Sequence, residues 1–486
     1  MQAITDFIAK AAENYWNVYT ISLLLGTGFL LTIATKGIQV RKFWMGFKFT
    51  MLGAFHKDDS SKEKGDITPF QALMTSLSST VGNGNIAGVA MALCYGGPGA
   101  IFWMWITAMV GMATKYSEAV LAVHYRKTAE DGSMSGGPMY YIRKGFENHP
   151  TLSKFGIPLA AIFAFFGAWT ALFGTGNMMQ ANSIALAFNK QFAAPFWVTG
   201  AVLFVLVSLV ILGGIKRIGK TAEILVPGMI ILYFGSALYI LGANITAIPA
   251  AFSLIFKHAF SPPAVFGGVL GYSVMIAIQQ GVRRGLLSNE SGLGSTPIAH
   301  AASKAKNPVR QGLIAMFDTF IDTIVVCTLT ALVILVSGVY ITNLGAGGEM
   351  IINPDIILPG GSGINEDMVS TALTASAFDS SLPWIGGKVV ALSSALFGYS
   401  TLIGWYYYGE RCFEYLFGLK QIKFYKLIYV TLTFTGAILQ KENLTIVWNM
   451  GDLSNGLMAV PNLFGLIFLS GMVYKITKEY VEGNKI

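Results

Sequence analysis

The chain has 486 residues, of which 53% are apolar and only 12% are charged, and its formal net charge is +8. Soluble domains carry about 25% charged residues, so this composition indicates a polytopic membrane protein. In a soluble protein the positive charge would suggest a nucleic-acid partner, but loops on one side of a membrane explain it better, and no nucleic-acid partner is expected. The three cysteines, Cys94, Cys327 and Cys412, are far apart and form no CxxC pair, so neither a disulfide framework nor a zinc site is indicated.

Apolar segments long enough to cross a bilayer, about 20 residues each, recur along the whole chain. We predict an all-α polytopic fold with eleven crossings, at about 15–35, 67–94, 98–123, 156–188, 196–214, 222–243, 264–282, 311–338, 384–409, 424–440 and 444–474. Most Lys and Arg residues then share the side of the C-terminus. The positive-inside rule therefore predicts a plasma-membrane protein with its N-terminus outside and its C-terminus in the cytoplasm. The acidic outer loop at 339–382 is expected to carry a short surface helix near Val369–Phe378.

The stretch from Ser78 to Gly88, with the sequence SSTVGNGNIAG, lies inside the second apolar segment. Each glycine inside a helix costs about 1 kcal/mol relative to alanine, and asparagine competes for backbone hydrogen bonds. In hydrocarbon the freed backbone groups must be satisfied by protein, ions or trapped water. We therefore expect an interrupted helix whose free N–H and C=O groups bind a ligand. The alternative is a tight helix crossing, because Gly84 and Gly88 have small-xxx-small spacing, but packing does not explain the two asparagines.

The seventh segment, 264–282, is the second irregular one. Its glycines are Gly267, Gly268, Gly271 and Gly281. If 15–35 is an extra N-terminal helix, ten segments remain, and the two irregular segments open two groups of five that run in opposite directions. We predict a single transmembrane domain with five-helix halves at 67–243 and 264–474, related as an inverted repeat. Interrupted helices in corresponding positions of inverted halves are typical of the substrate site of secondary transporters.

Three further stretches carry a family resemblance. Residues 96–111 read GGPGAIFWMWITAMVG, residues 135–142 read SGGPMYYI, and residues 288–302 read SNESGLGSTPIAHAA. All three resemble the sodium:alanine symporter family (alanine/glycine:cation symporters), the first of them across the whole of the family's signature. With the GNGN stretch, the resemblance covers about residues 65–303 at the level of motifs. It implies a leucine-transporter-type fold and import of alanine or glycine coupled to sodium or, in some members, to protons.

The resemblance also implies where ion and substrate bind. Thr80–Asn85 looks like the AVGLGN stretch of neurotransmitter:sodium symporters, with Asn85 at their sodium- and substrate-adjacent asparagine. Ser400 and Thr401 look like the hydroxyl pair that those transporters place opposite the broken helix to bind sodium. A second hydroxyl pair, Ser393-Ser394, lies two turns away in the same segment.

The chemistry of these residue types fits an amino acid and its coupling ion. A half-helix N-terminus offers unpaired N–H groups and the positive end of a dipole, so the amides of Asn83, Gly84 and Asn85 suit a carboxylate. Thr80 and Gly82 are further substrate contacts beside them. Sodium, like other hard cations, prefers oxygen ligands. The expected sodium ligands are the carbonyls of Ser78 and Val81 and the hydroxyls of Ser400 and Thr401. Ordinary helix–helix hydrogen bonding is the alternative for the hydroxyls.

Two other segments supply candidate pocket residues. They are Phe166, Thr170, Phe173 and Asn177 in the fourth segment and Ser273, Ile276 and Gln279 in the seventh. Helical spacing puts the first four on one stripe, where aromatic rings would wall a small pocket and Thr170 or Asn177 would meet the substrate ammonium. Ile276 would limit the size of the substrate side chain. In both segments, ordinary packing is the alternative.

Charged residues inside the spans are functional candidates by default. Lys115 and Glu118, three residues apart, are expected to pair on one helix face. Asp318 and Asp322 are placed near the inner end of the eighth segment. We expect their side chains to reach the membrane interface, with a salt bridge to the arginines at 283–284 as the alternative.

These observations predict a secondary active symporter that imports small neutral amino acids with sodium by alternating access around two broken helices. It is not expected to be an enzyme or to need a cofactor besides the coupling ion, because the five His show no HExxH spacing. The alternatives are a proton-coupled transporter of another small solute and, less favoured, an ion channel, since nothing suggests a filter built from several subunits. Glu290, in a turn-rich segment placed in the cytoplasm, receives no role.

Overall fold

The structure, a computed structural model, describes residues 7–8, 10–11, 14–55, 64–260, 274–344, 350–352, 371–439 and 441–483. The elements of the first part of the chain are α2 (Val18–Ala34), α3 (Ile38–Arg41), α4 (Phe43–Phe55), α5 (Pro69–Thr80), the 3-10 turn η2 (Asn83–Asn85), α6 (Ala87–Gly96), α7 (Gly99–His124), β1 (Lys127–Thr128), β2 (Met134–Ser135), α8 (Pro138–Phe146), α9 (Ser153–Phe173), α10 (Met178–Phe192), α11 (Phe196–Ile211) and α12 (Gly214–Ala243).

The second part continues with η3 (Ile245–Ala247), α13 (Ile248–Phe260), α14 (Val274–Asn289), α15 (Pro297–Ala301), α16 (Pro308–Thr319), the π-helical η5 (Phe320–Cys327), α17 (Thr328–Val336), β3 (Ile341–Leu344), β4 (Met350–Ile352), α19 (Thr371–Ser381), α20 (Gly386–Phe417), η8 (Leu419–Gln421), α21 (Ile422–Ile438) and α22 (Lys441–Gly483). Most of the predicted apolar ranges contain helices, but α4, α8 and α13 lie outside these ranges, and residues 264–273 of the seventh range are not described. Two ranges are divided: 67–94 forms α5, η2 and α6, and 156–188 forms α9 and α10.

The fold is mostly helical, with two small departures from the all-α prediction. Strands β1 and β2 pair antiparallel, with Lys127 opposite Ser135, and β3 pairs antiparallel with β4. Both pairs lie in connections between helices, where a short hairpin satisfies the backbone without a lipid-facing sheet edge. The mostly helical architecture agrees with the all-α prediction, and the two short hairpins are additions that the sequence analysis did not predict.

Several helices have the length and apolarity of membrane spans. Five such stretches are present in the described part of the chain: Ser153–Phe192, Gly214–Ala243, Pro308–Val336, Gly386–Phe417 and Ile446–Gly483. Shorter apolar helices are Val18–Ala34, Phe196–Ile211 and Ile245–Phe260. A helix rises 1.5 Å per residue, so the long stretches exceed the hydrocarbon thickness of about 30 Å. The structure is that of a multi-pass membrane protein.

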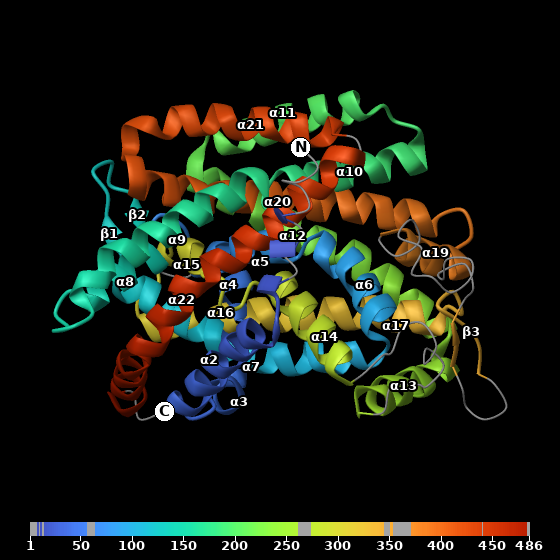
Figure 1. Cartoon of the computed structure of the whole chain (residues 1–486), viewed down its shortest axis with the longest axis horizontal. Helices are drawn as coiled ribbons and strands as arrows, with labels where there is room; N and C mark the ends of the chain where they lie inside the picture. The colour runs from blue at the N-terminus through green and yellow to red at the C-terminus, as the bar shows by residue number, and fades with distance from the viewer. Residues whose placement is uncertain are drawn as a thin grey trace.

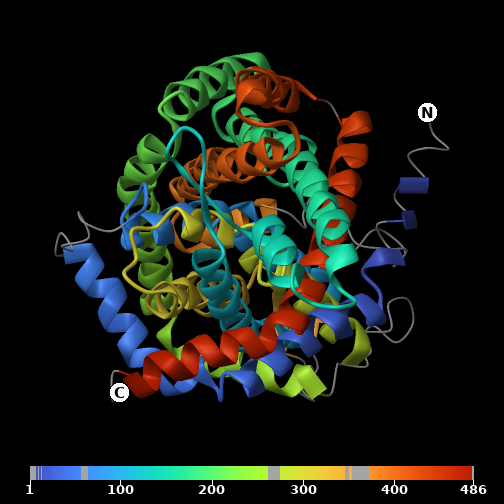
Figure 2. The same cartoon turned by 90° about the vertical axis from the view of Figure 1, so that its left-hand side faces the viewer.

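Helices α5 and α20 run through the middle of the molecule, as Figure 1 shows, with α10, α11 and α21 on one side and α2, α3 and α7 on the other. The core is centred on α20, where Trp405, Tyr406, Tyr407 and Tyr408 are almost completely buried. Below it, α14 crosses α7 closely at Gly281, where an added Cβ would collide with the carbonyl oxygen of Ala100. Figure 2 shows the β1–β2 hairpin and α8 projecting on the side that faces the viewer.

The helix expected near Val369–Phe378 is α19, which buries one face and leaves the other partly exposed. Leu373, Thr374, Ala377 and Phe378 are buried in its contacts with α20 and α6. The Thr374 hydroxyl donates a hydrogen bond to the carbonyl oxygen of Ile86 at 3.1 Å. One face of this helix is therefore packed inward, where Thr374 adds a second hydrogen bond to a carbonyl that also accepts from the Ala90 N–H at 3.4 Å.

Candidate functional site

The second apolar segment is interrupted where the GNGN stretch predicted. Helix α5 starts with a capping box between Thr68 and Gln71 and ends at Thr80. Val81 then leaves the helical region, with φ −74° and ψ 93°, and Gly82 is extended, with φ −138° and ψ −161°. One 3-10 turn follows before α6 begins at Ala87. The interruption leaves backbone groups without α-helical partners in the middle of a buried segment.

Asn85 holds the interruption in place. Its Oδ1 accepts a hydrogen bond from the Gly82 N–H at 2.8 Å, and its Nδ2 donates to the Asp322 Oδ1 at 2.6 Å. Asp322 also accepts from the hydroxyls of Ser288, at 2.9 Å, and Thr323, at 2.7 Å. Because the carboxylate can only accept, it fixes the orientation of the Asn85 amide. Asn85 is completely buried and does not line the cavity beside the interruption.

A second carboxylate, Asp318, binds the end of α5. It accepts hydrogen bonds from the hydroxyls of Ser76, at 2.5 Å, and Thr80, at 2.6 Å. The Lys115 ammonium lies 2.8 Å from the Asp318 Oδ2 and 2.7 Å from the Thr296 hydroxyl. Four helices therefore meet at one buried charged cluster, whose members satisfy each other's hydrogen-bonding groups.

Two predictions about charged residues were wrong. Asp318 and Asp322 do not reach the membrane interface, because both are completely buried against the broken helix. Lys115 pairs with Asp318 rather than with Glu118, and Glu118 instead accepts a hydrogen bond from the Asn462 amide at 2.7 Å. The partners lie some 200 or more positions away along the chain, so helix-face spacing within one segment could not identify them.

A cavity of about 80 Å³ lies beside the interruption. Of the predicted site residues it is lined by Thr80, Gly82, Asn83, Gly84 and Thr401. Its other walls are Ser79, Ala87, Gly88, Met91, Thr175, Met179, Gln180, Ser183, Arg284, Leu287, Glu290, Trp405, Trp448 and Asp452. A water molecule occupies about 30 Å³ in the liquid, so the cavity suits a solute of only a few non-hydrogen atoms.

The predicted sodium ligands lie around the end of α5. The Ser400 hydroxyl is 3.0 Å from the carbonyl oxygen of Ser78, and Thr401 Oγ1 would lie 2.9 Å from a Cβ added at Gly82. Val81 is completely buried at the C-cap of α5. The structure thus brings the Ser78 carbonyl and the Ser400 hydroxyl together and places Thr401 beside Gly82, while the Ser400 and Thr401 hydroxyls also donate to the carbonyl oxygen of Phe397 within α20. Among the described residues, no group of three or more His, Cys, Asp or Glu could hold a metal ion.

The other hydroxyl pair of α20 has different partners. The Ser394 hydroxyl donates to Asn83 Oδ1 at 2.5 Å, while Asn83 Nδ2 donates to Gln180 Oε1 at 2.9 Å. Ser393 Oγ is buried and has no hydrogen-bond partner within the described ranges. Asn83 is therefore held between α20 and α10, with its main chain facing the cavity.

The fourth segment borders the cavity through residues that the sequence analysis did not select. A GTGN stretch, Gly174 to Asn177, separates α9 from α10. This interruption breaks the predicted stripe, because residues before and after it no longer share one helix face. Beyond it the cavity receives Thr175, Met179, Gln180 and Ser183. The same reasoning that identified GNGN would have identified GTGN.

Phe166, Thr170 and Asn177 do not line the cavity in this structure. Phe166 is half-buried and lies edge-to-face against Phe165, with ring centroids 5.3 Å apart. The Thr170 hydroxyl donates to Ser454 Oγ at 2.9 Å. Asn177 Nδ2 donates to the carbonyl oxygen of Tyr429 at 2.9 Å. The contacts of Thr170 and Asn177 join neighbouring helices, whereas the ring contact of Phe166 lies within α9.

The seventh segment is only partly described. Ser273 and the glycines at 267, 268 and 271, with the break expected there, lie outside the described residues. Ile276 and Gln279 are half-buried on α14 and do not line the cavity. Helix α14 is continuous from Val274 to Asn289 and reaches the cavity with its last turns.

Glu290 is a cavity residue that the sequence analysis left without a role. It follows the end of α14, is only 4% exposed, and has φ +55°. Trp405 Nε1 donates to its Oε1 at 2.8 Å, and the Ser295 hydroxyl donates to its Oε2. The SNESGLGS loop does form turns, as predicted, but it folds back into the core, so Glu290 is buried. A carboxylate among glycines and serines, directly after a helix, was the available signal.

Arg283 does not pair with Asp318 or Asp322, the partners that the sequence analysis gave as an alternative. Its Nη2 lies 2.8 Å from Asp452 Oδ2 on α22, and both side chains are partly exposed. Asp452 also lines the cavity. The pair joins α14 to α22 at an edge of the cavity, and neither Asp318 nor Asp322 takes part.

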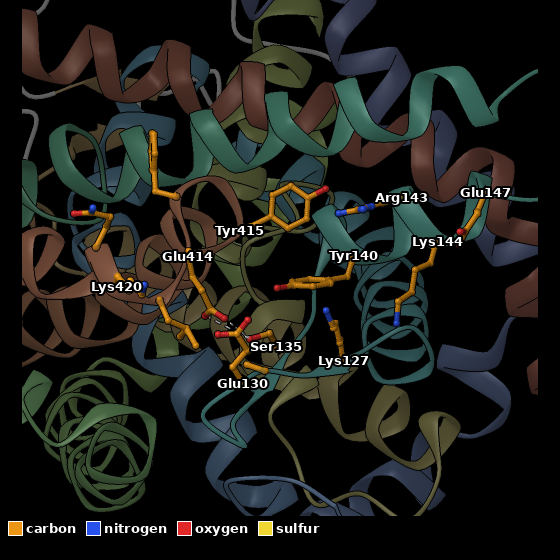
Figure 3. Close-up of a pocket in the computed structure, with 15 residues that line it drawn as sticks. Lys127, Glu130, Ser135, Tyr140, Arg143, Lys144, Glu147, Glu414, Tyr415 and Lys420 are labelled. Carbon is orange, nitrogen blue, oxygen red and sulfur yellow. Dashed lines mark hydrogen bonds between the residues drawn. The ribbon is translucent and has the colours of Figure 1, made fainter.

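A larger hollow of about 730 Å³ lies at the β1–β2 hairpin, α8 and the end of α20. Figure 3 shows Lys127, Arg143 and Lys144 near Tyr140, with Glu130 and Glu414 beside Ser135. Arg411 Nη1 lies 2.5 Å from Glu414 Oε2. This open hollow mixes charges of both signs and is far too large for a solute of a few atoms. The enclosed cavity at the helix interruption is therefore the candidate functional site.

Comparisons with known proteins agree with this architecture. The sequence model of the sodium:alanine symporter family matches residues 1–486. The chain is 46% identical to the sodium/alanine symporter AgcS of Methanococcus maripaludis, over 97% of this chain and 96% of that protein. It is 36% identical to the putative sodium/proton-dependent alanine carrier protein YrbD of Bacillus subtilis, over 99% of this chain and 93% of that protein.

Among solved structures, the chain resembles a manganese transporter of Eremococcus coleocola, with a TM-score of 0.52 and 12% identity over 84% of this chain and 80% of that one. At this identity the likeness concerns the fold alone. The family match spans the whole chain and the sequence relatives cover nearly all of it. This chain belongs to the sodium:alanine symporter family.

Proposed function

We propose that this protein imports alanine, together with sodium, by alternating access around the interruption between α5 and α6. The observation that carries the proposal is the cavity of about 80 Å³ against Gly82, Asn83 and Gly84, where the backbone leaves the helix. Relatives at 46% and 36% identity carry names that refer to sodium and alanine. Glycine, which is smaller than alanine, is a second expected substrate of the same cavity.

The local chemistry supports an amino acid at this place. The N–H groups at the start of η2 and α6 have no α-helical acceptors, and the positive end of the α6 dipole lies beside them. A substrate carboxylate would accept these hydrogen bonds without a clash, because Gly82 and Gly84 allow close approach to the backbone. Thr80 lies at the other side of the interruption and adds a hydroxyl to the same cavity.

Sodium is proposed to bind between α5 and α20. The carbonyl oxygens of Ser78 and Val81 and the hydroxyls of Ser400 and Thr401 would be its ligands, in keeping with the preference of hard cations for oxygen. Thr401 lines the cavity and lies beside Gly82. A single residue would thus contact both the ion site and the substrate cavity, which supports coupling between the two.

We propose the same topology that the sequence predicts. Eleven crossings would comprise an extra helix at 15–35 and two inverted five-helix halves at 67–243 and 264–474, with the N-terminus outside and the C-terminus in the cytoplasm. The distribution of Lys and Arg supports this orientation. An inward sodium gradient would drive import, since each charge that crosses about 100 mV contributes about 2.3 kcal/mol.

The test is uptake of radiolabelled alanine by the purified protein in liposomes, with an inward sodium gradient or with choline in place of sodium. We expect accumulation only with sodium. Equal uptake in choline would contradict sodium coupling. Uptake that follows an imposed proton gradient would favour the proton-coupled alternative. A panel of unlabelled glycine, serine, leucine and glutamine, each competing with labelled alanine, would define the size limit of the site.

A further inference from the structure

Two opposite charges line the substrate cavity near the end of α14. Arg284 lies in the last turns of this helix, and Glu290 follows the helix directly. No ion pair joins either residue to a described side chain of opposite charge. Charged groups that leave water are normally paired, because an unpaired buried charge costs several kcal/mol. The cavity therefore presents a basic group, Arg284, and an acidic group, Glu290, that form no close ion pair in the described part of the protein, beside a second acid, Asp452, that is paired with Arg283.

The environment of Glu290 leaves room for a cation. Its two carboxylate oxygens accept hydrogen bonds from Trp405 and Ser295, and both donors are neutral. A carboxylate offers about four acceptor positions, so further donors can bind. The buried ammonium of Lys115 is not available, since Asp318 and Thr296 already hold it at 2.8 Å and 2.7 Å.

The backbone at Glu290 is a second, independent sign of function. Its φ of +55° is in the left-handed region, which is uncommon for a residue other than glycine. Such conformations are concentrated at functional sites. Glycine is frequent in the same loop, at 292 and 294, yet position 290 carries a carboxylate. The strained turn places this acid at the cavity wall.

Arg284 is placed to meet an anion. Its Nε has no hydrogen-bond partner among the residues that the structure describes. The Nε of the neighbouring Arg283 likewise has none there, but the Nη2 of Arg283 binds Asp452 at 2.8 Å. A guanidinium group binds a carboxylate through two parallel N–H donors. Arg284 can therefore supplement the backbone amides near Gly82 and Gly84 in binding a carboxylate.

We propose that Glu290 and Arg284 make the site selective for zwitterions. The ammonium of the bound amino acid donates hydrogen bonds to Glu290, and Arg284 donates to its carboxylate. This inference rests on the proposed function, because it names the groups by which the same cavity recognises its substrate. It also explains why a cavity for a neutral solute is lined by charged residues.

Ligand binding can be measured directly, because Trp405 and Trp448 line the cavity and their fluorescence will report its occupancy. Purified full-length protein in sodium is titrated with alanine, with propionate, which lacks the ammonium, and with alaninamide, which lacks the carboxylate. The variants are Glu290→Gln, which keeps an acceptor for Trp405, and Arg284→Gln. Matched controls are Glu130→Gln and Arg143→Gln in the hollow of Figure 3.

We expect Glu290→Gln to weaken alanine binding by about tenfold or more, the loss typical of one charge-assisted hydrogen bond, while propionate binding stays the same or improves. Arg284→Gln should reduce the preference for alanine over alaninamide by a similar factor. Both controls should behave like the wild type. Thermal melting of each variant identifies those that fail to fold, and for those the conservative change Glu290→Asp or Arg284→Lys is titrated instead.

An unchanged ratio of alanine to propionate affinity in a folded Glu290 variant would overturn the inference. A Glu290 variant in which only the dependence of binding on sodium concentration changes would also overturn the inference, because Glu290 would then bind the ion rather than the substrate. Failure of the proposed function has a different signature, because the wild-type protein itself would then not bind or take up alanine in sodium.

Discussion

Two helices of this protein are interrupted by nearly the same four residues, Gly82-Asn83-Gly84-Asn85 and Gly174-Thr175-Gly176-Asn177. Both interruptions border the same cavity. They differ in what holds the asparagine at the fourth position. The amide of Asn85 donates to the carboxylate of Asp322 at 2.6 Å, whereas the amide of Asn177 donates to the carbonyl oxygen of Tyr429 at 2.9 Å.

The difference indicates distinct roles for the two interruptions. The second is closed by neutral groups: Tyr429 donates its hydroxyl to the carbonyl oxygen of Gly176 at 2.9 Å, and Thr433 donates to Asn177 Oδ1 at 2.8 Å. The first is held by two buried carboxylates, Asp318 and Asp322. Charge-assisted hydrogen bonds are about twice as strong as neutral ones. We therefore expect substitutions to affect transport most at the first interruption and stability most at the second.

The largest effect is expected for Asp322→Ala. This change leaves the side chains of Asn85, Ser288 and Thr323 without their shared acceptor, at a cost of about 3 kcal/mol, so sodium-driven alanine uptake should fall about 100-fold. Asp322→Asn restores a neutral acceptor for Asn85 and should recover part of the activity. Uptake by Asp322→Ala equal to that of the wild type would contradict a role for the carboxylate.

The next largest effect is expected from a matched pair of variants at Asn85 and Asn177, the fourth residues of the two interruptions. Asn85→Ala removes the acceptor for the Gly82 N–H and should weaken alanine binding by about tenfold, which corresponds to one lost hydrogen bond of about 1.4 kcal/mol. Asn177→Ala should leave binding within about threefold of the wild type and lower the melting temperature. Titration by tryptophan fluorescence and thermal melting separate the two outcomes. If Asn177→Ala weakened binding as strongly as Asn85→Ala, the two interruptions would not differ in role.

A smaller effect, on stability, is expected for Gly176→Ala. An added Cβ would lie 2.8 Å from the Trp405 Cβ and 3.0 Å from the Ala171 Cα, neither of which can move without shifting a helix. Overpacking of this kind costs about 1–3 kcal/mol, so the protein should melt at a lower temperature. A melting temperature equal to that of the wild type would show that the α9–α10 junction is looser than the structure indicates.

The smallest effect is expected for Gly82→Ala. The new Cβ would meet mainly the hydroxyl oxygen of Thr401, at 2.9 Å, and this hydroxyl can rotate away. Because Thr401 is also a proposed sodium ligand and Gly82 a proposed substrate contact, we expect a few-fold increase in the sodium concentration that gives half-maximal uptake and a few-fold weaker binding of alanine, with little change in stability. The double variant Gly82→Ala with Thr401→Ala should show no further loss beyond that of Thr401→Ala alone. An additive loss would place the sodium site elsewhere.

Local patterns predicted much of this molecule. The glycines and asparagines of Ser78–Gly88 identified the interruption, because their cost in a helix is a local property. Hydropathy located the helices for the same reason. The fourth segment was misinterpreted because helical spacing was assumed to continue from Phe166 to Asn177, whereas α9 ends at Phe173, before the GTGN stretch.

The buried charges could not be predicted in the same way. Lys115 binds Asp318 and Asn85 binds Asp322 across about 200 positions or more of the chain. Spacing within one helix suggested Glu118 as the partner of Lys115, but packing of α7 against α16 decided the outcome. Glu290 was missed because a turn-rich stretch normally lies at the surface, whereas the loop after α14 folds back against Trp405.

The most direct test of the account is an experimental structure of the full chain in saturating alanine and sodium. We predict density for the amino acid in the cavity beside Gly82, Asn83 and Gly84, with its ammonium toward Glu290, and α5 and α6 still separated at the interruption. A continuous helix through residues 80–87, or alanine bound in another place such as the hollow beside the β1–β2 hairpin, would contradict it.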